Sequence, residues 1–257
     1  MNLELHWHPE PGVLDGIVVL SFLYLLAAGP LRKYLDESQP FPKRQTLWFF
    51  SGVVVLFLAV GSPLEKLSEE YLFSAHMFQH VLLIYLVPAL FLKGLPAWMM
   101  RPLLAMEWSG PLFRFFTRPV VAWLVFNGLF YLWHVPGLYE WALRDPSIHF
   151  LEHATFMGAA MLVWWPTLSP TEELPRLDYG PQLLYVLAIG LAQTPLFAFL
   201  TFSSTVFYPT YAQAARITSL TPIEDQVLGG VIMKLAAMVA TFYAVAFIFY
   251  RWYEKSR

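Results

Sequence analysis

Seven long apolar segments divide this chain and limit what it can fold into more than any other feature. A helix needs about 20 predominantly apolar residues to cross the hydrocarbon core of a bilayer. We expect spans at residues 13–31, 46–60, 71–92, 120–135, 148–165, 182–202 and 226–252. The N-terminus lacks a basic region, so we expect no cleaved signal peptide. The sequence therefore predicts an all-α, polytopic membrane protein, with residues 1–257 forming a single seven-helix membrane domain.

Composition supports a membrane protein and narrows its chemistry. The chain is 58% hydrophobic and only 13% charged, whereas soluble domains are about 45–50% apolar and about 25% charged. The net charge of −2 gives no indication of nucleic acid as a partner. The absence of cysteine excludes thiolate metal sites and iron–sulfur clusters. Any bound metal must therefore be held by histidine, methionine, carboxylate or backbone groups.

The distribution of basic residues orients the predicted spans. If the N-terminus lies outside, the cytoplasmic segments carry 12 Lys and Arg residues and the outer segments carry three, with Lys234 inside the seventh span. Basic residues collect on the cytoplasmic side of membrane proteins. We therefore expect seven transmembrane helices with the N-terminus outside and the C-terminus inside.

A histidine pattern occurs twice near the predicted outer surface. The sequence Ser-x-His-x-x-x-His appears at residues 74–80 and again at residues 147–153. Residues four apart lie on one face of a helix, so each copy directs two imidazoles the same way. Imidazole is a common ligand of transition metals and of haem. The candidate metal ligands are therefore His76, His80, His149 and His153.

Three more histidines lie at the same predicted level. His134 ends the fourth span and is joined to the fifth by a short loop, whereas His6 and His8 lie in the N-terminal tail. A lone histidine at a helix end is often only an interfacial residue, and neighbouring tryptophans fit an aromatic belt. We expect His134 to join the two pairs as a ligand, and we keep His6 and His8 as weaker candidates.

The start of the seventh span adds polar groups at this depth. Asp225 has three interpretations: a metal ligand, an acceptor for an imidazole N–H, or a helix cap. Two glycines that follow it would let another helix approach closely. Thioether and imidazole together favour Cu(I). The possible additional ligands or ligand partners are Met77, Asp225, Gln226 and Met233.

These motifs, in this order, resemble the CtaG family of multi-pass cytochrome c oxidase assembly factors from Gram-positive and related bacteria. The resemblance rests on His76-Met77-x-x-His80, Trp133-His134-x-Pro136, His149-x-x-x-His153 and Asp225-Gln226-x-x-x-Gly230-x-x-Met233. Lys234 departs from the apolar or aromatic residue expected there. The resemblance implies a bacterial cytoplasmic-membrane protein that helps mature a haem–copper oxidase, with copper as the bound metal. It also implies oxidase subunits, and a copper chaperone at the outer face, as partners.

Other functions stay open at this point. Two histidines on different helices can hold a haem, so a haem b electron carrier or quinol-linked oxidoreductase is one alternative. An ion or metal transporter is another, although the inner halves of the spans carry few polar residues. A third is an assembly scaffold that binds no metal. No substrate chemistry is visible, so we do not expect an enzyme.

Overall fold

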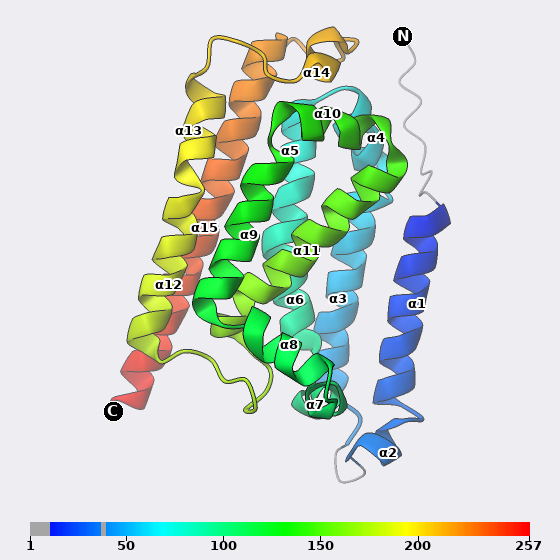
Figure 1. Cartoon of the computed structure of the whole chain (residues 1–257), viewed down its shortest axis with the longest axis vertical. Coiled ribbons are helices and arrows are strands. Elements are labelled where there is room, and N and C mark those ends of the chain that lie inside the picture. Colours follow the sequence, from blue (N-terminus) through cyan, green and yellow to red (C-terminus); the bar gives the residue numbers. More distant parts are fainter. Residues whose placement is uncertain (1–10, 37–39) are drawn as a thin grey trace.

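The computed structural model describes residues 11–36 and 40–257, and these residues form helices and short connections without a strand (Figure 1). The elements are α1 (Pro11–Ala28), α2 (Arg32–Asp36), α3 (Lys43–Val60), α4 (Pro63–Glu70), α5 (Phe73–Val81), the π-helical η1 (Leu82–Leu86), α6 (Val87–Gly94), α7 (Ala97–Ala105), α8 (Ser109–Phe116), α9 (Pro119–Trp133), α10 (Pro136–Arg144), α11 (Pro146–Leu168), α12 (Tyr179–Ala192), α13 (Thr194–Phe202), α14 (Pro209–Gln213) and α15 (Pro222–Lys255). The all-α expectation is confirmed for the described residues.

Every expected span falls on a helix, or on helices joined end to end, but not all are equally apolar. Within the described residues, four are long and apolar enough to cross a membrane: α3, the continuous α5–η1–α6, α12 with α13, and α15. The pair α8 and α9, bent by 79°, can be a fifth. The apolar helix α1 is shorter than these when taken over Gly12–Ala28. The helix α11 is long enough at 23 residues, but Glu152 and two histidines lower its apolar character.

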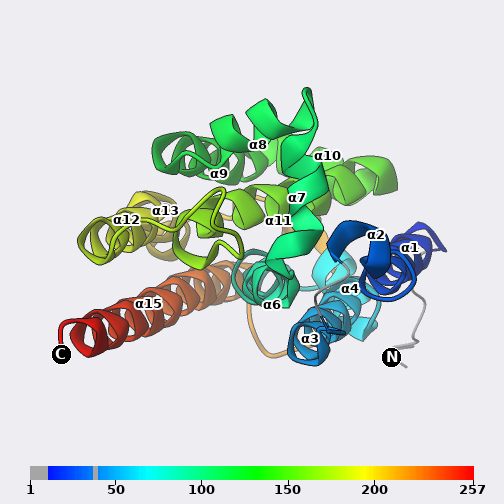
Figure 2. The ribbon, with the colours of Figure 1, turned by 90° about the horizontal axis from the view of Figure 1, so that it is seen from below.

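The helix α11 runs obliquely through the middle of the molecule, with α9 on one side and α6 on the other (Figures 1 and 2). The helix α5 packs against α15 and α4. Three short helices, α4, α10 and α14, lie together at one end, and α7 and α8 lie at the opposite end (Figure 1). The first turns of α5 and α11 therefore lie at the end of the molecule that carries α4, α10 and α14.

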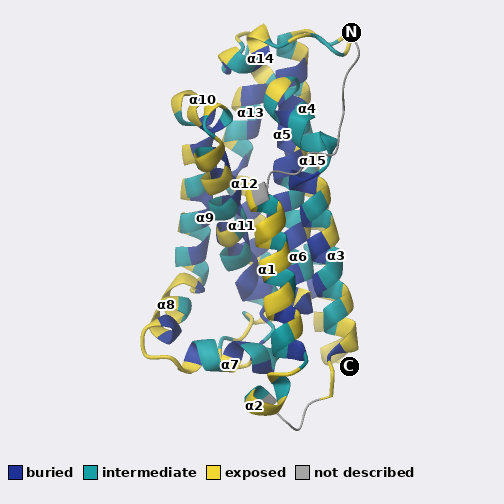
Figure 3. Cartoon of the chain, turned by 90° about the vertical axis from the view of Figure 1, so that its right-hand side faces the viewer, coloured by how far each residue is buried: buried dark blue, intermediate teal, exposed yellow. Residues whose placement is uncertain are grey.

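Buried apolar side chains form two clusters. The larger one joins α5, α9, α11, α12 and α15, and the smaller one lies between α1, α3 and α6. Large apolar side chains stay exposed on the outward faces, including Phe22 on α1 and Phe242 on α15. Figure 3 shows exposed residues in yellow along the outward face of α1. Exposed apolar surface of this extent suits contact with lipid rather than water.

Candidate metal centre

The two histidine pairs meet between α5 and α11. The ring centroids of His76 and His149 lie 5.6 Å apart, and those of His80 and His153 lie 5.5 Å apart. His134, directly after α9, places its ring centroid 6.1 Å from that of His80. Side chains one helical turn apart share a face, which explains why each pair points inward together. The structure thus brings all five candidate histidines into one group.

The start of α5 is held in place by α15. Asp225 accepts hydrogen bonds from the backbone N–H of Phe73 (2.8 Å) and Ser74 (3.2 Å) and from the Ser74 hydroxyl (2.5 Å). A carboxylate at a helix N-terminus satisfies unpaired amide groups and interacts favourably with the helix dipole. Gly229 lets the two helices approach, because a Cβ there would lie 2.4 Å from the Phe73 ring. Asp225 therefore caps α5, not its own helix, and fixes the position of His76.

The start of α11 uses local capping instead. Asp145 is the N-cap, and its side chain accepts from the backbone N–H of Ser147 (2.9 Å) and Ile148 (3.4 Å). Pro146 occupies the first turn, where its missing N–H costs nothing. Asp145 and Pro146 thus define the start of α11, and His149 lies in its first turn.

A buried carboxylate completes the group. Glu152 is 0% exposed, and one of its oxygens lies 3.6 Å from His80 Nε2. Neither Glu152 oxygen has a hydrogen-bond partner among the described residues. His76, His149, Glu152 and His153 each offer one donor atom, and these four atoms lie within 4.8 Å of one another. Three imidazoles and one carboxylate form a set that can hold a transition-metal ion.

A tyrosine fixes the ring of His76. The Tyr211 hydroxyl, from α14, donates to the backbone carbonyl of Ser68 (2.6 Å) and lies 3.0 Å from His76 Nδ1. Burial raises the pKa of Tyr211 well above its ordinary value, so the hydroxyl keeps its proton. Because that proton is donated to Ser68, the phenol oxygen accepts from the His76 Nδ1–H. His76 Nε2 is therefore the unprotonated nitrogen and a competent ligand.

Two other histidines are oriented in the same way. His149 Nδ1 lies 2.5 Å from a carboxylate oxygen of Glu69, and His134 Nδ1 lies 2.6 Å from the backbone carbonyl of Phe130. Both acceptors require a proton on Nδ1, which leaves Nε2 with its lone pair. The Nε2 atoms of His134, His149 and His153 are buried and have no hydrogen-bond partner among the described residues.

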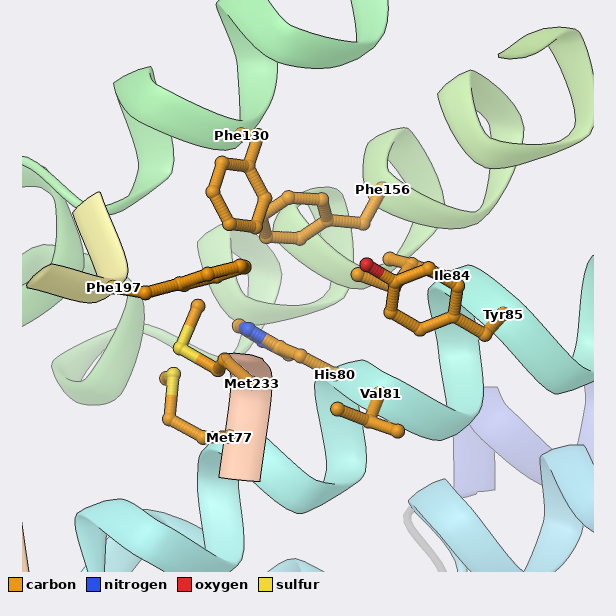
Figure 4. Close-up of a pocket in the computed structure, with 9 residues that line it drawn as sticks. All are labelled: Met77, His80, Val81, Ile84, Tyr85, Phe130, Phe156, Phe197 and Met233. Atoms are coloured by element: carbon orange, nitrogen blue, oxygen red, sulfur yellow. The ribbon is translucent and has the colours of Figure 1, made fainter. Parts of the chain in front are cut away.

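The remaining sequence candidates lie around this group and not inside it. Met77 and Met233 line a small cavity beside His80 with several aromatic rings (Figure 4). Gln226 accepts from the Phe207 N–H (2.8 Å) and donates to the Thr205 carbonyl (3.0 Å), so it ties α15 to the segment after α13. His6 and His8 lie outside the described residues.

Lys234 has a local partner near the break between α12 and α13. Its Nζ donates to the Thr194 hydroxyl at 3.0 Å. At the break itself, the Tyr85 hydroxyl donates to the side-chain oxygen of Gln193 at 2.7 Å. This polar group lies deeper along α15 than Asp225, and Tyr85 also lines the small cavity beside His80.

Sequence reasoning passed over three functional candidates. Glu152 lies inside the second histidine motif, and an ionisable residue within an apolar run is a signal of function. Glu69 lies in the connection before the third span. Its position four residues after Glu65 indicates that the two carboxylates share a helix face, which is the signal in the sequence for a ligand role. Nothing in the sequence points to Tyr211, because its contact with His76 joins residues 135 positions apart.

Comparison with known proteins assigns the chain to a described family. The family model of the cytochrome c oxidase caa3 assembly factor (Caa3_CtaG) matches residues 22–255, which include the whole histidine group. Two uncharacterised proteins, from Mycobacterium bovis and Mycobacterium tuberculosis, are each 26% identical over 255 aligned residues. These alignments cover 86% of this chain but only 37% of each relative, so the chain spans well under half of their length. No solved structure matches the chain.

Proposed function

Because the chain belongs to the cytochrome c oxidase caa3 assembly factor family, we propose that it assists assembly of a haem–copper oxidase by binding copper at the buried histidine group. One observation carries the copper step. The imidazoles of His76, His134 and His149 each give their Nδ1 proton to a fixed acceptor, and each keeps Nε2 as the unprotonated nitrogen. Metal-binding histidines almost always have such an acceptor behind them, because it sets the tautomer and the ring orientation.

The donor atoms fit a single ion with small movements. A four-coordinate ion with bonds of about 2.0–2.1 Å places its ligand atoms roughly 3.3 Å apart. The donor atoms of His76, His149, Glu152 and His153 already lie within 4.8 Å of one another. The Glu152 carboxylate supplies a negative charge next to the ion, which offsets the cost of burying a cation.

The ligand chemistry favours copper over other ions. The chain has no cysteine, and sites built from imidazole and carboxylate bind Cu²⁺ most strongly among the divalent first-row metals. In this proposal copper is cargo for the oxidase, and the chain acts as a binding protein.

The proposal includes a location. We place the protein in the bacterial cytoplasmic membrane with seven crossings and the N-terminus outside, as the distribution of basic residues indicates. In that orientation the ends of α5 and α11 that carry the histidines face the outer surface. Copper would arrive there from an outer-face chaperone and leave toward an oxidase subunit.

The haem alternative has less support. The cavity beside His80 measures about 10 Å³, which is close to the minimum for a single water molecule. A haem b site between these helices would need a flat slot many times larger. Whether the protein is instead a scaffold that binds no metal is tested by the metal analysis that follows.

Metal analysis of the purified full chain after copper loading and removal of loosely bound metal tests the proposal. We expect about one tightly bound copper per chain in the wild type, and its loss in the double variant His76→Ala/His153→Ala. Phe150→Ala is a matched control, because this exposed side chain lies in the same turn of α11 and offers no ligand atom. Equal copper in the wild type and the double variant would refute the site. A Soret band in the purified protein would favour haem, and a wild type without tight copper would favour the scaffold.

A further inference from the structure

A second group of possible metal ligands lies directly outside the first. Glu65 and Glu69 are one turn apart on α4, and their oxygens lie 3.7 Å and 2.5 Å from His149 Nδ1. One donor atom from each of these three residues falls within 4.8 Å of the other two. Two carboxylates and one imidazole form an oxygen-rich set, which suits Cu²⁺ and other divalent ions.

His149 belongs to both groups. Its Nδ1 faces the two carboxylates of α4, and its Nε2, on the other edge of the ring, has no hydrogen-bond partner among the described residues. The His149 ring centroid is 4.2 Å from that of His153 and 5.6 Å from that of His76. A single imidazole therefore joins the carboxylates of α4 to the buried ligands.

Burial increases steadily from the outer group to the buried one. The side chain of Glu69 is 29% exposed, that of Glu65 17% and that of His149 5%, whereas Glu152 is 0% exposed. The helix α4 lies at the end of the molecule where α10 and α14 also lie (Figure 1). The carboxylates are thus the part of the combined cluster that water reaches.

A buried amide supports a ligand role for the outer group. The Gln79 side chain is 0% exposed and donates from Nε2 to Glu65 and to the Ala59 carbonyl. Its Oε1 has no hydrogen-bond partner among the described residues. An unpaired amide oxygen this deeply buried is costly. The nitrogen of the same amide contacts Glu65, so a cation bound by that carboxylate would lie close to the amide.

We propose that Glu65, Glu69 and His149 form an entrance site that takes a divalent copper ion from the aqueous phase and passes it through the shared His149 to the buried group. This inference rests on the proposed function, because it takes the buried group as the destination. Two carboxylates at a partly exposed mouth attract cations and raise the rate of association. At the entrance site the ion takes the place of the His149 Nδ1 proton, which moves to Nε2 of the same ring. When the ion moves on to Nε2, the proton returns to Nδ1, so carboxylate ligands are exchanged for imidazoles without release of the ion to water.

The experiment separates the two sites by substitution in the full chain, purified in detergent. Glu65→Gln/Glu69→Gln removes both outer charges, and a glutamine at 69 can still accept the His149 Nδ1–H. His76→Ala/His153→Ala removes two inner ligands and leaves the outer three. Cu²⁺ is added to each protein, the number of bound ions and their EPR signals are recorded at equilibrium, and the filling of the tight site is followed by stopped flow.

We expect the wild type to show one tight and one weaker Cu²⁺ site. The Glu65→Gln/Glu69→Gln protein, the outer variant, keeps the tight site and loses the weaker one. Its tight site fills with copper about tenfold more slowly, at a rate that depends less on salt. The His76→Ala/His153→Ala protein, the inner variant, keeps only the weaker site. Glu70→Gln is the matched control: it removes one charge from an exposed position of α4 outside the group, and it should fill like the wild type.

Two failures can be told apart. An outer variant with the wild-type number of sites and the wild-type filling rate overturns the entrance site alone. An inner variant with unchanged tight binding overturns the proposed function instead. If the double outer variant does not fold, the single variants Glu65→Gln and Glu69→Gln replace it, and unchanged filling in both overturns the entrance site.

Discussion

The Nε2 atoms of His76 and His80 lie 2.8 Å apart in the first two turns of α5. A contact this short between two neutral imidazoles is a hydrogen bond, so one nitrogen must carry a proton and the other must not. His76 gives its Nδ1 proton to Tyr211, so its Nε2 is the acceptor and His80 Nε2–H is the donor. A metal ion on His76 Nε2 therefore takes the place of the hydrogen bond from His80, which keeps its proton, and the two histidines have different roles.

The first prediction follows from this difference. His76 belongs to the set of four donors within 4.8 Å, whereas His80 does not. We expect His76→Ala to weaken copper binding by about 100-fold or more, and His80→Ala by about tenfold or less, the lower range for a residue that touches a ligand without binding the ion. Competition with a chelator of known affinity measures both values. Equal losses in the two variants would show that His80 is itself a ligand.

Tyr211 should control copper affinity without contacting the ion. Tyr211→Phe removes the acceptor of the His76 Nδ1–H and leaves the ring volume nearly unchanged, so we expect a roughly 10- to 100-fold lower affinity. Chelator competition gives the affinity, and thermal unfolding in detergent verifies the fold. The control is Tyr131→Phe, whose hydroxyl donates to the backbone carbonyl of Ala192 and not to a histidine. Wild-type affinity in Tyr211→Phe would contradict the assigned tautomer of His76.

Local spacing explains why the histidine group could be predicted. The four-residue interval between His76 and His80 and between His149 and His153 fixes which side chains share a helix face, whatever the rest of the fold does. The cap at Asp145 follows in the same way from a cap residue before a proline. Apolar length located the helices as well, although it did not distinguish α11, whose polar residues make it less apolar than the other long helices.

Long-range contacts explain what could not be predicted. Asp225 caps α5 across 151 or more residues of sequence, so its spacing within α15 suggested a ligand or a cap for its own helix. That helix is capped by Thr221 and Glu224 instead. Tyr211 reaches His76 from α14, a five-residue helix in a connection with no periodic pattern. Only the arrangement of helices in space reveals these partners.

The third prediction concerns stability at the α5–α15 contact. Asp225→Asn removes the charge that three donors of α5 share, so we expect the free energy of unfolding to fall by about 2 kcal/mol, the range for hydrogen bonds to a charged group. Denaturant unfolding in detergent, monitored by tryptophan fluorescence, measures the change. Glu224→Gln is the comparison: it alters an exposed capping box and should cost about 1 kcal/mol or less. A smaller loss for Asp225→Asn than for Glu224→Gln would argue against the capping role of Asp225.

The same contact depends on the absence of a side chain at Gly229. A Cβ there would lie 2.4 Å and 2.5 Å from two ring atoms of Phe73 and 3.2 Å from Met77, so α5 or α15 must move to admit it. We expect Gly229→Ala to lower the free energy of unfolding by about 1–3 kcal/mol, as overpacking does, and to weaken copper binding because His76 follows Phe73 on α5. Gly158→Ala is the matched control on α11, where nothing lies within 4 Å of the added carbon, and helix propensity should raise stability by up to about 1 kcal/mol. Denaturant unfolding and copper titration of both variants give the two readouts. A Gly229→Ala protein as stable as Gly158→Ala would show that α5 and α15 are not held at the observed separation.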